Sequence, residues 1–541
     1  MKKFRKFTVF LLCASLLMCL AACGSTTEPS SNEAPVEVPS DNDDGDEEVF
    51  ILDGPGEIYE PEPEVLPIGT MVGAYTDYDW SDDTQTGILS YAEVALTDSY
   101  AELYPALSQA LSDAFRARAE EMRNSYDAMM ENVALDMESG TFYGPYRMTE
   151  AASVRRADSS VTSILISGYF YGGGAHGTPY YAALNFNSQT GETLKLSDIV
   201  DDGAFLGQLV QAQLEEEYRD VNFYASAEDY FTDLDSDAIV WTLDRSGLTI
   251  WFGVYELAPY SEGSLSVTIP FAGNDGLFTV SRDRVTESCA VQLTLGAPYY
   301  IDLDGDATLN RIELNAIPDE YDWYNSVTVC VDGSEQEFEI YGYSIVPFLI
   351  CTVSGTNALY LQLTAENDYK SVEVLRLEPG AASEVGSYNI AFESLYREDG
   401  LTNYFTILPT GAEDMWMTTR LFIMGTRNGE KRYSVSNSGE PVTDDAMYQT
   451  VGTAEVTLNL PLTANVLDTS TGEASAETVD LAAGTVLQFI ATDGNSSGVS
   501  ACNLQTADGT VVRVNVDCGS WPHTINGTDI EELFSGIIFA G

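Results

Sequence analysis

The first twenty or so residues are the most informative feature of the sequence, because their pattern indicates a segment that is not part of the folded protein. Four basic residues (Lys2, Lys3, Arg5 and Lys6) precede a mostly apolar stretch of 14 residues, 7–20. A membrane-spanning helix needs about 20 apolar residues, whereas this length and order are typical of a secretory signal peptide. No later stretch reaches about 18 apolar residues, so the sequence predicts no other membrane span.

The apolar stretch ends in Leu-Ala-Ala-Cys-Gly at residues 20–24. This run resembles the lipobox of bacterial lipoproteins, in which a small residue precedes the cysteine that is modified. The resemblance implies cleavage before Cys23, acylation of Cys23, and attachment to the lipid bilayer at the extracytoplasmic face of the cell membrane. Two acyl chains hold a protein on a bilayer stably, whereas one is marginal. The alternative is an ordinary signal peptide cut near Ala22.

Residues 24–66 follow the predicted signal peptide (1–23) and differ from the rest of the chain. They hold 14 acidic residues, six prolines and no Lys or Arg. Such a segment buries too little apolar surface to offset the entropy of ordering it. We therefore expect an extended, self-repelling tether between the anchor and the folded part.

The charge and the histidine content narrow the classes of function. The chain has 24 Lys+Arg against 85 Asp+Glu, a formal net charge of -61. Nucleic-acid binding needs a basic face, so no nucleic-acid partner is expected. Only His176 and His523 are present, which argues against a multi-histidine zinc site and leaves two candidate bases for a histidine-based triad.

Residues 67–285 combine helix and strand patterns. Apolar residues recur at intervals of three or four between 107 and 129, which predicts one buried face of an amphipathic helix: Leu107, Leu111, Phe115, Ala119, Met122, Tyr126 and Met129. Pro105 fits the first turn of that helix. A second helix is predicted from Ala204 to about Tyr218. Strand-like runs lie at 161–170, 247–252 and 267–271.

A set of short motifs in this region is ordered like that of a known family. Residues 172–177 read GGGAHG, 184–187 LNFN, 190–192 TGE, 194–199 LKLSDI, 255–260 YELAPY and 267–271 VTIPF. Together they resemble the paired DUF4163 and DUF3298 domains, which occur in the ectodomain of the lysozyme-sensing anti-sigma factor RsiV and in a peptidoglycan deacetylase. The resemblance implies an extracytoplasmic α+β domain with helices packed on an antiparallel sheet.

The same resemblance indicates a ligand class and argues against catalysis. Lysozyme or a cell-wall component such as peptidoglycan becomes the expected partner. The deacetylase carries its chemistry in a separate domain with a His-x-x-x-His metal site, and neither histidine of this chain has such a partner. We therefore expect no enzymatic activity.

Five residues are candidates for ligand binding in this region: Gly173, Gly174, His176, Tyr255 and Tyr260. A glycine-rich run allows positive φ angles and close backbone approach, and the tyrosines are suited to lining a sugar or peptide groove. The alternatives are a tight connection between strands for the glycines, a packed or loop position for His176, and core filling for the tyrosines.

Residues 286–445 are rich in strand-like alternation and contain an Asp-x-Asp-Gly-Asp loop. Alternate carboxylates in a tight turn converge, and hard oxygen ligands suit Ca²⁺, so the loop is a candidate structural Ca²⁺ site, and no other cofactor is expected. Its candidate ligands are Asp302, Asp304, Asp306, Thr308, Asn310 and Glu313. Ala307 stands where an EF-hand needs Gly, and the loop looks more like those of bacterial surface β-repeat proteins. The alternative is a solvated acidic turn.

Residues 446–541 predict short strands about ten residues apart, which favours a small barrel. The pattern resembles bacterial SH3-like modules, which often bind wall peptides. An exported protein can form disulfides, and Cys502 and Cys518 flank a predicted hairpin, so a bond between them is possible. Five cysteines remain after the anchor, so at least one is free or pairs elsewhere.

The predicted architecture is thus an α+β domain at 67–285, a β-rich domain at 286–445 and an SH3-like barrel at 446–541, behind an anchor and a tether. The expected function is a membrane-anchored, non-catalytic binding or sensing module for lysozyme or cell-wall components. A cell-wall hydrolase with His176 or an acid pair as the base, and a purely structural surface protein, stay open as alternatives.

Overall fold

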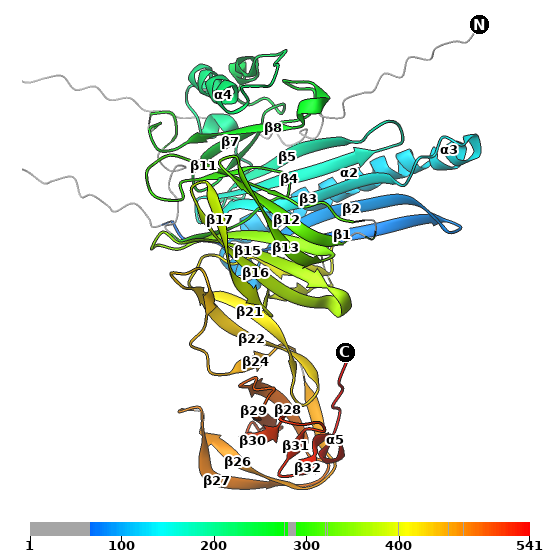
Figure 1. Cartoon of the computed structure of the whole chain (residues 1–541), viewed down its shortest axis with the longest axis vertical. Helices are drawn as coiled ribbons and strands as arrows, with labels where there is room; N and C mark the ends of the chain where they lie inside the picture. The colour runs from blue at the N-terminus through cyan, green and yellow to red at the C-terminus, as the bar shows by residue number, and fades with distance from the viewer. Residues whose placement is uncertain are drawn as a thin grey trace, which may run out of the picture. The chain divides into compact units, whose positions relative to one another are not determined.

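The computed structural model describes residues 65–540, except 275, 280–287, 320, 322, 399, 453 and 469. The signal peptide, Cys23 and the tether as far as residue 64 lie outside the described residues. Val65 onward forms one compact unit, built mostly from strands with few helices (Figure 1). Of the predicted α+β class, the structure supports the coarser statement: several sheets, accompanied by a few helices.

A seven-stranded sheet has the order β19-β20-β1-β2-β3-β4-β5. Its strands are β1 (Thr70–Ser81), β2 (Thr84–Leu96), β3 (Tyr146–Ala157), β4 (Val161–Tyr171), β5 (Thr178–Asn187), β19 (Ser394–Tyr396) and β20 (Tyr404–Ile407). Of these neighbours, β2 and β3 pair in parallel, and a parallel pair needs a crossover connection. Three helices supply it: α1 (Asp98–Leu103), α2 (Pro105–Met130) and α3 (Val133–Ser139).

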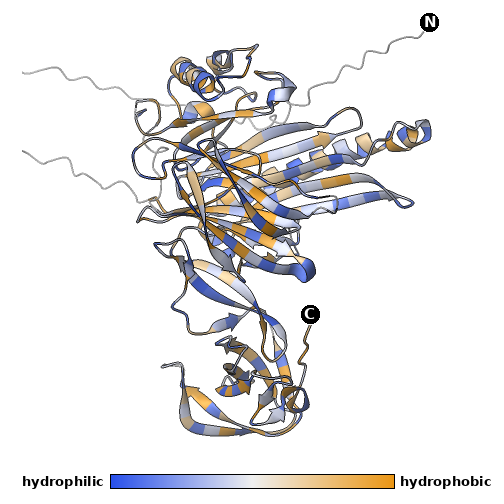
Figure 2. Ribbon diagram, in the orientation of Figure 1, coloured by the Kyte–Doolittle hydropathy of each residue, from blue (hydrophilic) through white to orange (hydrophobic). Residues whose placement is uncertain are grey.

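The long helix α2 has the buried face that the sequence predicted. Its buried residues are the seven apolar residues from Leu107 to Met129 named above, and Pro105 occupies its first turn. Hydrophobic and hydrophilic positions alternate along it in Figure 2. The helix packs on β2 and β3 (Figure 1), so the three- or four-residue spacing was sufficient to identify which side faces the sheet.

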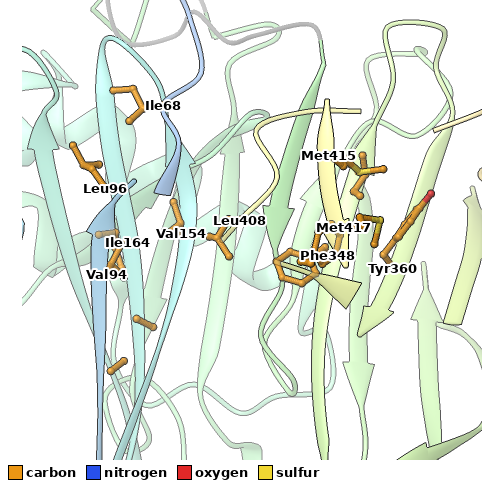
Figure 3. Close-up of a cluster of buried hydrophobic side chains, with 14 of the residues drawn as sticks. Ile68, Val94, Leu96, Val154, Ile164, Phe348, Tyr360, Leu408, Met415 and Met417 are labelled. Atoms are coloured by element: carbon orange, nitrogen blue, oxygen red, sulfur yellow. The ribbon is translucent and has the colours of Figure 1, made fainter. Parts of the chain in front are cut away.

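One hydrophobic core joins segments that are far apart in the sequence. Figure 3 shows residues of this core from two parts of the chain: Ile68, Val94, Leu96, Val154 and Ile164 from the first, and Phe348, Tyr360, Leu408, Met415 and Met417 from the second. In the seven-stranded sheet, β20 also pairs with β1, with Phe405 opposite Gly73. Both the sheet and the core therefore extend across the expected boundary at residue 285.

A three-stranded sheet, β6-β7-β8, carries a second core. Its strands are β6 (Val240–Leu243), β7 (Gly247–Phe252) and β8 (Leu265–Pro270). Helix α4 (Gly203–Glu217) covers it, starting one residue before the predicted position, and the Asp202 side chain caps its N-terminus by accepting a hydrogen bond from the Phe205 N–H at 2.9 Å. Three 3₁₀ turns accompany it: η1 (Leu196–Asp198), η2 (Ala227–Thr232) and η3 (Tyr260–Glu262).

Two further sheets enclose a third core. The four-stranded one, β10-β11-β12-β13, comprises β10 (Tyr299–Ile301), β11 (Asn310–Asn315), β12 (Tyr324–Val331) and β13 (Ser334–Gly342). The five-stranded one, β17-β16-β15-β14-β9, comprises β9 (Cys289–Gln292), β14 (Ser344–Cys351), β15 (Asn357–Ala365), β16 (Tyr369–Glu378) and β17 (Ala381–Tyr388), with the 3₁₀ turn η4 (Glu366–Asp368). Apolar residues from both sheets pack against each other.

The C-terminal strands do not form the predicted SH3-like barrel. They belong to an open 14-stranded sheet made of β18 (Ala391–Phe392), β21 (Met415–Phe422), β22 (Thr426–Val435), β23 (Pro441–Val442), β24 (Tyr448–Thr450), β25 (Glu455–Leu458), β26 (Leu462–Asp468), β27 (Glu473–Leu481), β28 (Val486–Thr492), β29 (Val499–Thr506), β30 (Val511–Asp517), β31 (Thr524–Ile525), β32 (Thr528–Asp529) and β33 (Phe534–Ser535). A short helix, α5 (Ile530–Leu533), precedes β33. Among the described residues β27 pairs with β26 alone, so the ring of pairings that a barrel needs stays open.

Candidate functional site

The glycine-rich run at 172–177 connects two antiparallel strands, β4 and β5. Gly173 and Gly174 have φ angles of 84° and 121°, which side chains with a Cβ rarely adopt. A Cβ at Gly173 would lie 2.7 Å from the Tyr146 hydroxyl. These observations favour the tight-connection alternative for the glycines.

The predicted tyrosines lie beside this connection. The centre of the Tyr260 ring is 4.1 Å from that of the His176 ring and 5.5 Å from that of the Tyr255 ring. The Tyr260 hydroxyl donates a hydrogen bond to the Gly177 carbonyl at 2.8 Å. Residues about 80 positions apart in the sequence are thus brought together.

A further aromatic residue, Tyr169 on β4, completes the group. A Cβ at Gly177 would lie 2.3 Å from the Tyr169 ring, so this ring rests directly on the Gly177 backbone. We call Tyr169, His176, Tyr255 and Tyr260 the aromatic shelf. Tyr169, His176 and Tyr255 are solvent-exposed, and sequence reasoning missed Tyr169 because a strand aromatic is equally typical of a core.

The shelf is held by ordered backbone. Tyr255 has a φ of 68°, an uncommon conformation for a residue with a side chain. The Tyr224 hydroxyl donates to the Tyr255 carbonyl, which fixes that turn. Burial raises the pKa of the neighbouring Glu256 carboxyl, while a hydrogen bond from the Gly253 N–H acts in the opposite direction. The rings are therefore presented from a hydrogen-bonded turn and a tight hairpin.

A buried polar network supports the strands that carry the shelf. Arg118 of α2 makes two hydrogen bonds to Glu150 of β3, at 2.7 and 2.5 Å. Glu150 also accepts a hydrogen bond from the Tyr180 hydroxyl of β5 at 2.6 Å, and burial together with this carboxylate raises the pKa of Tyr180. One carboxylate thus links the helix to two strands of the sheet.

The acidic loop brings part of its predicted ligand set together. One oxygen from each of Asp302, Asp304 and Asp306 lies within 4.8 Å of the others. The Asp302 carboxylate also accepts the N–H groups of Gly305 at 2.7 Å and Ala307 at 2.8 Å. Ala307 has a φ of 69°, so it adopts the left-handed conformation for which an EF-hand uses Gly.

Of the remaining predicted ligands, Asn310 and Glu313 have side chains with other partners. Asn310 accepts from the Leu303 N–H and donates to Asp332. Glu313 lies on β11, where Arg311 donates to it at 2.6 Å. Thr308 donates its N–H to Asp306 at 2.7 Å. The EF-hand spacing therefore does not produce an EF-hand ligand set, because the chain re-enters a strand at Asn310.

The predicted Cys502–Cys518 disulfide is wrong. Both cysteines are buried free thiols. Cys502 is opposite Val514, whereas the Cys518 N–H bonds to the Gly498 carbonyl. Cys518 is therefore four residues beyond the position opposite Cys502. At about 3.3 Å per residue, this distance exceeds the roughly 7 Å Cα separation that a disulfide spans. Near the C-terminus, the rings of Trp521 and His523 pack around Phe539.

A buried ion pair lies between the seven-stranded and three-stranded sheets, and sequence reasoning missed it. Arg155 and Asp244 are fully buried, 3.3 Å apart. The Arg155 guanidinium also lies over the rings of Trp251 at 5.3 Å and Tyr299 at 4.6 Å. Burial raises the pKa of Asp244, against the lowering effects of Arg155 and two backbone N–H groups.

A small cavity of about 50 Å³ lies next to this pair. Its walls include three arginines, Arg155, Arg156 and Arg245, together with Asp158 and Cys289. Arg156 forms an ion pair with Asp158 at 2.5 Å. The chain has only 24 Lys+Arg in all, and three of its arginines line this cavity. No local sequence pattern indicates this group, since only Arg155 and Arg156 are adjacent in sequence.

Cys23, the predicted anchor, lies outside the described residues. Within them, even the 26-residue α2 is too polar to span a bilayer, and no other helix is long and apolar enough.

Comparison with known proteins identifies one part of the chain. Residues 197–272 match the family described as "Protein of unknown function (DUF3298)". The chain is similar to a DUF3298 family member from Bacteroides fragilis, with 18% identity over 40% of this chain and 96% of that one and a TM-score of 0.32. It is also similar to one from Pseudomonas aeruginosa, with 19% identity, the same coverage and a TM-score of 0.27. None of the curated proteins matches it. Residues 197–272, which supply Tyr255 and Tyr260 of the aromatic shelf, are a DUF3298 domain.

Proposed function

We propose that this chain is a lipid-anchored extracytoplasmic protein that binds cell-wall glycan, without catalysis, on the aromatic shelf. The observation that carries the proposal is the shelf itself: four rings gathered from β4, the β4–β5 connection and the DUF3298 domain, three of them solvent-exposed. Aromatic rings present an apolar face with a negative quadrupole, which attracts the weakly positive C–H face of a sugar ring.

The rigidity of the shelf supports this role. The Tyr260 hydroxyl is bonded to the Gly177 carbonyl, and the Tyr224 hydroxyl holds the backbone that carries the Tyr255 ring. A surface that is ordered before binding loses less conformational entropy when the ligand arrives. We further propose that residues 67–196 are a DUF4163-like domain and that the two domains together resemble the RsiV ectodomain. On this proposal the protein lies outside the cell, where wall polymer is available.

The test is binding of insoluble peptidoglycan and of soluble glycan fragments by the mature chain. Tyr255→Ala removes one exposed ring, and one aromatic contact of about 0.5–1.5 kcal/mol corresponds to roughly a twofold to twelvefold loss of affinity. Tyr396→Ala is the matched control, because Tyr396 is 53% exposed against 56% for Tyr255. Each of the two also has a neighbouring tyrosine ring: Tyr404 is 5.2 Å from Tyr396, and Tyr260 is 5.5 Å from Tyr255.

Three outcomes would contradict the proposal. Absence of wild-type binding at high micromolar fragment would leave the purely structural alternative. Equal losses for Tyr255→Ala and Tyr396→Ala would remove the shelf as the site. Release of soluble fragments that stops in His176→Ala would establish the hydrolase alternative instead.

Lysozyme is the second candidate ligand, and the charge of the chain favours it. A net charge of -61 would speed the encounter with a basic protein, most strongly at low salt. Binding through charge should weaken as salt shortens the screening length and should not depend on Tyr255. The same titration at two salt concentrations therefore separates the two ligands.

The anchor is tested separately from the ligand. The lipobox resemblance predicts that the mature chain fractionates with membranes and that Cys23→Ser releases it, because the acyl chains that hold it are then missing. Membrane retention of Cys23→Ser would contradict the proposed anchor without affecting the shelf.

The acidic loop is proposed to hold a structural Ca²⁺. The convergence of Asp302, Asp304 and Asp306 within 4.8 Å supports it, since Ca²⁺ takes six to eight oxygen ligands and accepts carboxylate, carbonyl and water together. Asn310 and Glu313, which the sequence analysis included, are not part of this proposed set, because their side chains have other partners.

A further inference from the structure

Two cysteines from distant parts of the chain lie directly opposite each other. In the five-stranded sheet, Cys289 of β9 pairs with Cys351 of the antiparallel strand β14. Both are free thiols, and opposed residues in such a ladder project to the same face. Cys351 is buried in the core between the two sheets, and Cys289 packs against that core.

The register of the ladder brings the pair within the Cα separation that a disulfide spans. The Leu293 N–H donates to the Pro347 carbonyl at 2.9 Å, which marks that pair as hydrogen-bonded. Pairs of this type alternate along an antiparallel ladder, with Cα atoms about 5.5 Å apart. Cys289 and Cys351 lie four residues further along and are therefore of the same type. A Cα separation of about 5.5–6 Å is the commonest one in disulfides.

A third residue makes the two thiols chemically unequal. Arg245 donates from Nη1 to the Cys289 sulfur at 3.4 Å. A hydrogen bond from the Cys351 thiol and the charge of Arg245 lower the pKa of Cys289 to about 7, although burial and the Asp244 charge oppose them. The same hydrogen bond, together with burial, raises the pKa of Cys351.

Access is also unequal. Cys289 is only partly buried and lines the small cavity together with Arg245. Cys351 is 2% exposed, and it is not among the residues that line this cavity. A reagent in solution therefore meets Cys289 first, and Cys351 stands behind it.

We propose that Cys289 and Cys351 are a redox site that closes reversibly to a cross-strand disulfide by exchange with an external low-molecular-weight disulfide. This site lies apart from the aromatic shelf and does not depend on the ligand proposed there. Nothing in the local sequence indicates it, because 62 positions separate the two cysteines.

The exchange has two steps. The Cys289 thiolate attacks one sulfur of the external disulfide, forms a mixed disulfide and expels a thiolate, which takes up a proton. Cys351 then loses its proton, attacks the Cys289 sulfur and expels the second thiolate. The two protein thiols are oxidised by two electrons in all, and one external disulfide is reduced to two thiols.

The test treats the mature chain with 2-hydroxyethyl disulfide and analyses it by intact mass and peptide mapping. The expected product has lost two hydrogen atoms, contains a linked Cys289–Cys351 peptide, and returns to the starting mass with dithiothreitol. Cys330 is the internal control, because it is a partly exposed thiol opposite Glu335 and Glu313 and so cannot close a disulfide across the ladder.

Two variants test the order of attack. Cys351→Ser should accumulate the mixed disulfide on Cys289, because the second thiol is missing. Cys289→Ser should react much more slowly at Cys351, because that thiol is buried. In the wild type, the rate of Cys289 alkylation should rise with a midpoint near pH 7, and Arg245→Met should move the midpoint upward.

Several results would overturn the proposal, and the first needs no variant. Wild-type protein that keeps a stable mixed disulfide on Cys289, or that links Cys502 to Cys518 instead, would exclude closure of this pair. Faster reaction of Cys351 than of Cys289 would exclude the assigned order. An alkylation midpoint near that of an ordinary thiol, about 8.5, would remove the activation of Cys289 by the Cys351 hydrogen bond and the Arg245 charge.

Discussion

The buried ion pair between Arg155 and Asp244 gives the sharpest prediction about stability, and the change to make is Asp244→Asn. The Asp244 carboxylate accepts the N–H groups of Ser246 at 2.9 Å and Gly247 at 3.2 Å through Oδ1. Through Oδ2 it accepts Arg155 and the Thr249 hydroxyl, both at 3.3 Å. The amide keeps the first two bonds and turns a donor toward the guanidinium, which leaves a buried charge uncompensated.

The magnitude follows from the distance and the burial. Two unit charges 3.3 Å apart interact by about 5 kcal/mol at an effective dielectric constant of about 20. Asn is less costly to bury than an ionised Asp, which offsets part of this loss. Removing one member of a buried pair costs about 3–5 kcal/mol. We therefore expect Asp244→Asn to lower the free energy of unfolding by an amount within that range.

Urea unfolding followed by circular dichroism measures the loss. Asp235→Asn is the matched control, because Asp235 pairs with Lys195 at 3.0 Å with both side chains exposed, and surface pairs contribute about 0–1 kcal/mol. The double variant Arg155→Met, Asp244→Asn removes both charges and should recover part of the stability. A loss below about 1 kcal/mol for Asp244→Asn, or a double variant less stable than both singles, would refute this reasoning.

Three further predictions concern other described residues. Burial raises the pKa of Glu93, despite the N–H groups of Leu401 and Thr402 that bond to it. The folded chain therefore holds that proton more tightly, and stability falls as pH rises from about 4.3 to the raised value. Glu93→Gln should remove this fall in pH-dependent urea unfolding, and an unchanged profile would contradict it. Ca²⁺ at 100 times its Kd should stabilise the wild type by about 2.7 kcal/mol in thermal unfolding and leave Asp304→Asn unaffected; equal shifts in both would exclude the loop. Ala307→Gly should raise the free energy of unfolding by about 1 kcal/mol, because Gly has no Cβ to strain at positive φ; a loss of stability would show that Ala307 is not strained.

The candidate shelf was partly accessible from the sequence. His176, Tyr255 and Tyr260 were identified because they belong to a resemblance whose motifs are ordered along the chain, and the structure brings them within ring contact. Tyr169 was not identified, since its role depends on lying against Gly177 across a hairpin. A strand aromatic faces either the core or the solvent, and the alternation alone does not say which partner it meets.

The acidic loop and the cysteines show where local spacing was insufficient. The Asp-x-Asp-Gly-Asp turn formed as expected, because its hydrogen bonds are between near neighbours. Glu313 lies apart from the three aspartates in its contacts, because β11 begins at Asn310 and the Glu313 carboxylate pairs with Arg311. The Cys502–Cys518 hypothesis counted residues around a hairpin without its register, whereas Cys289 and Cys351 became a pair only through the register of β9 with β14.

Periodicity within one segment was enough to determine α2 with its buried face and the start of α4, because these elements are stabilised by contacts a few residues apart and by one apolar side. Pairing between distant segments decided the rest: β20 beside β1, the core shared by both parts of the chain, and the open C-terminal sheet. The physical reason is that a strand completes its hydrogen bonds with a partner strand tens to hundreds of positions away. No local pattern of side chains encodes which strand that will be.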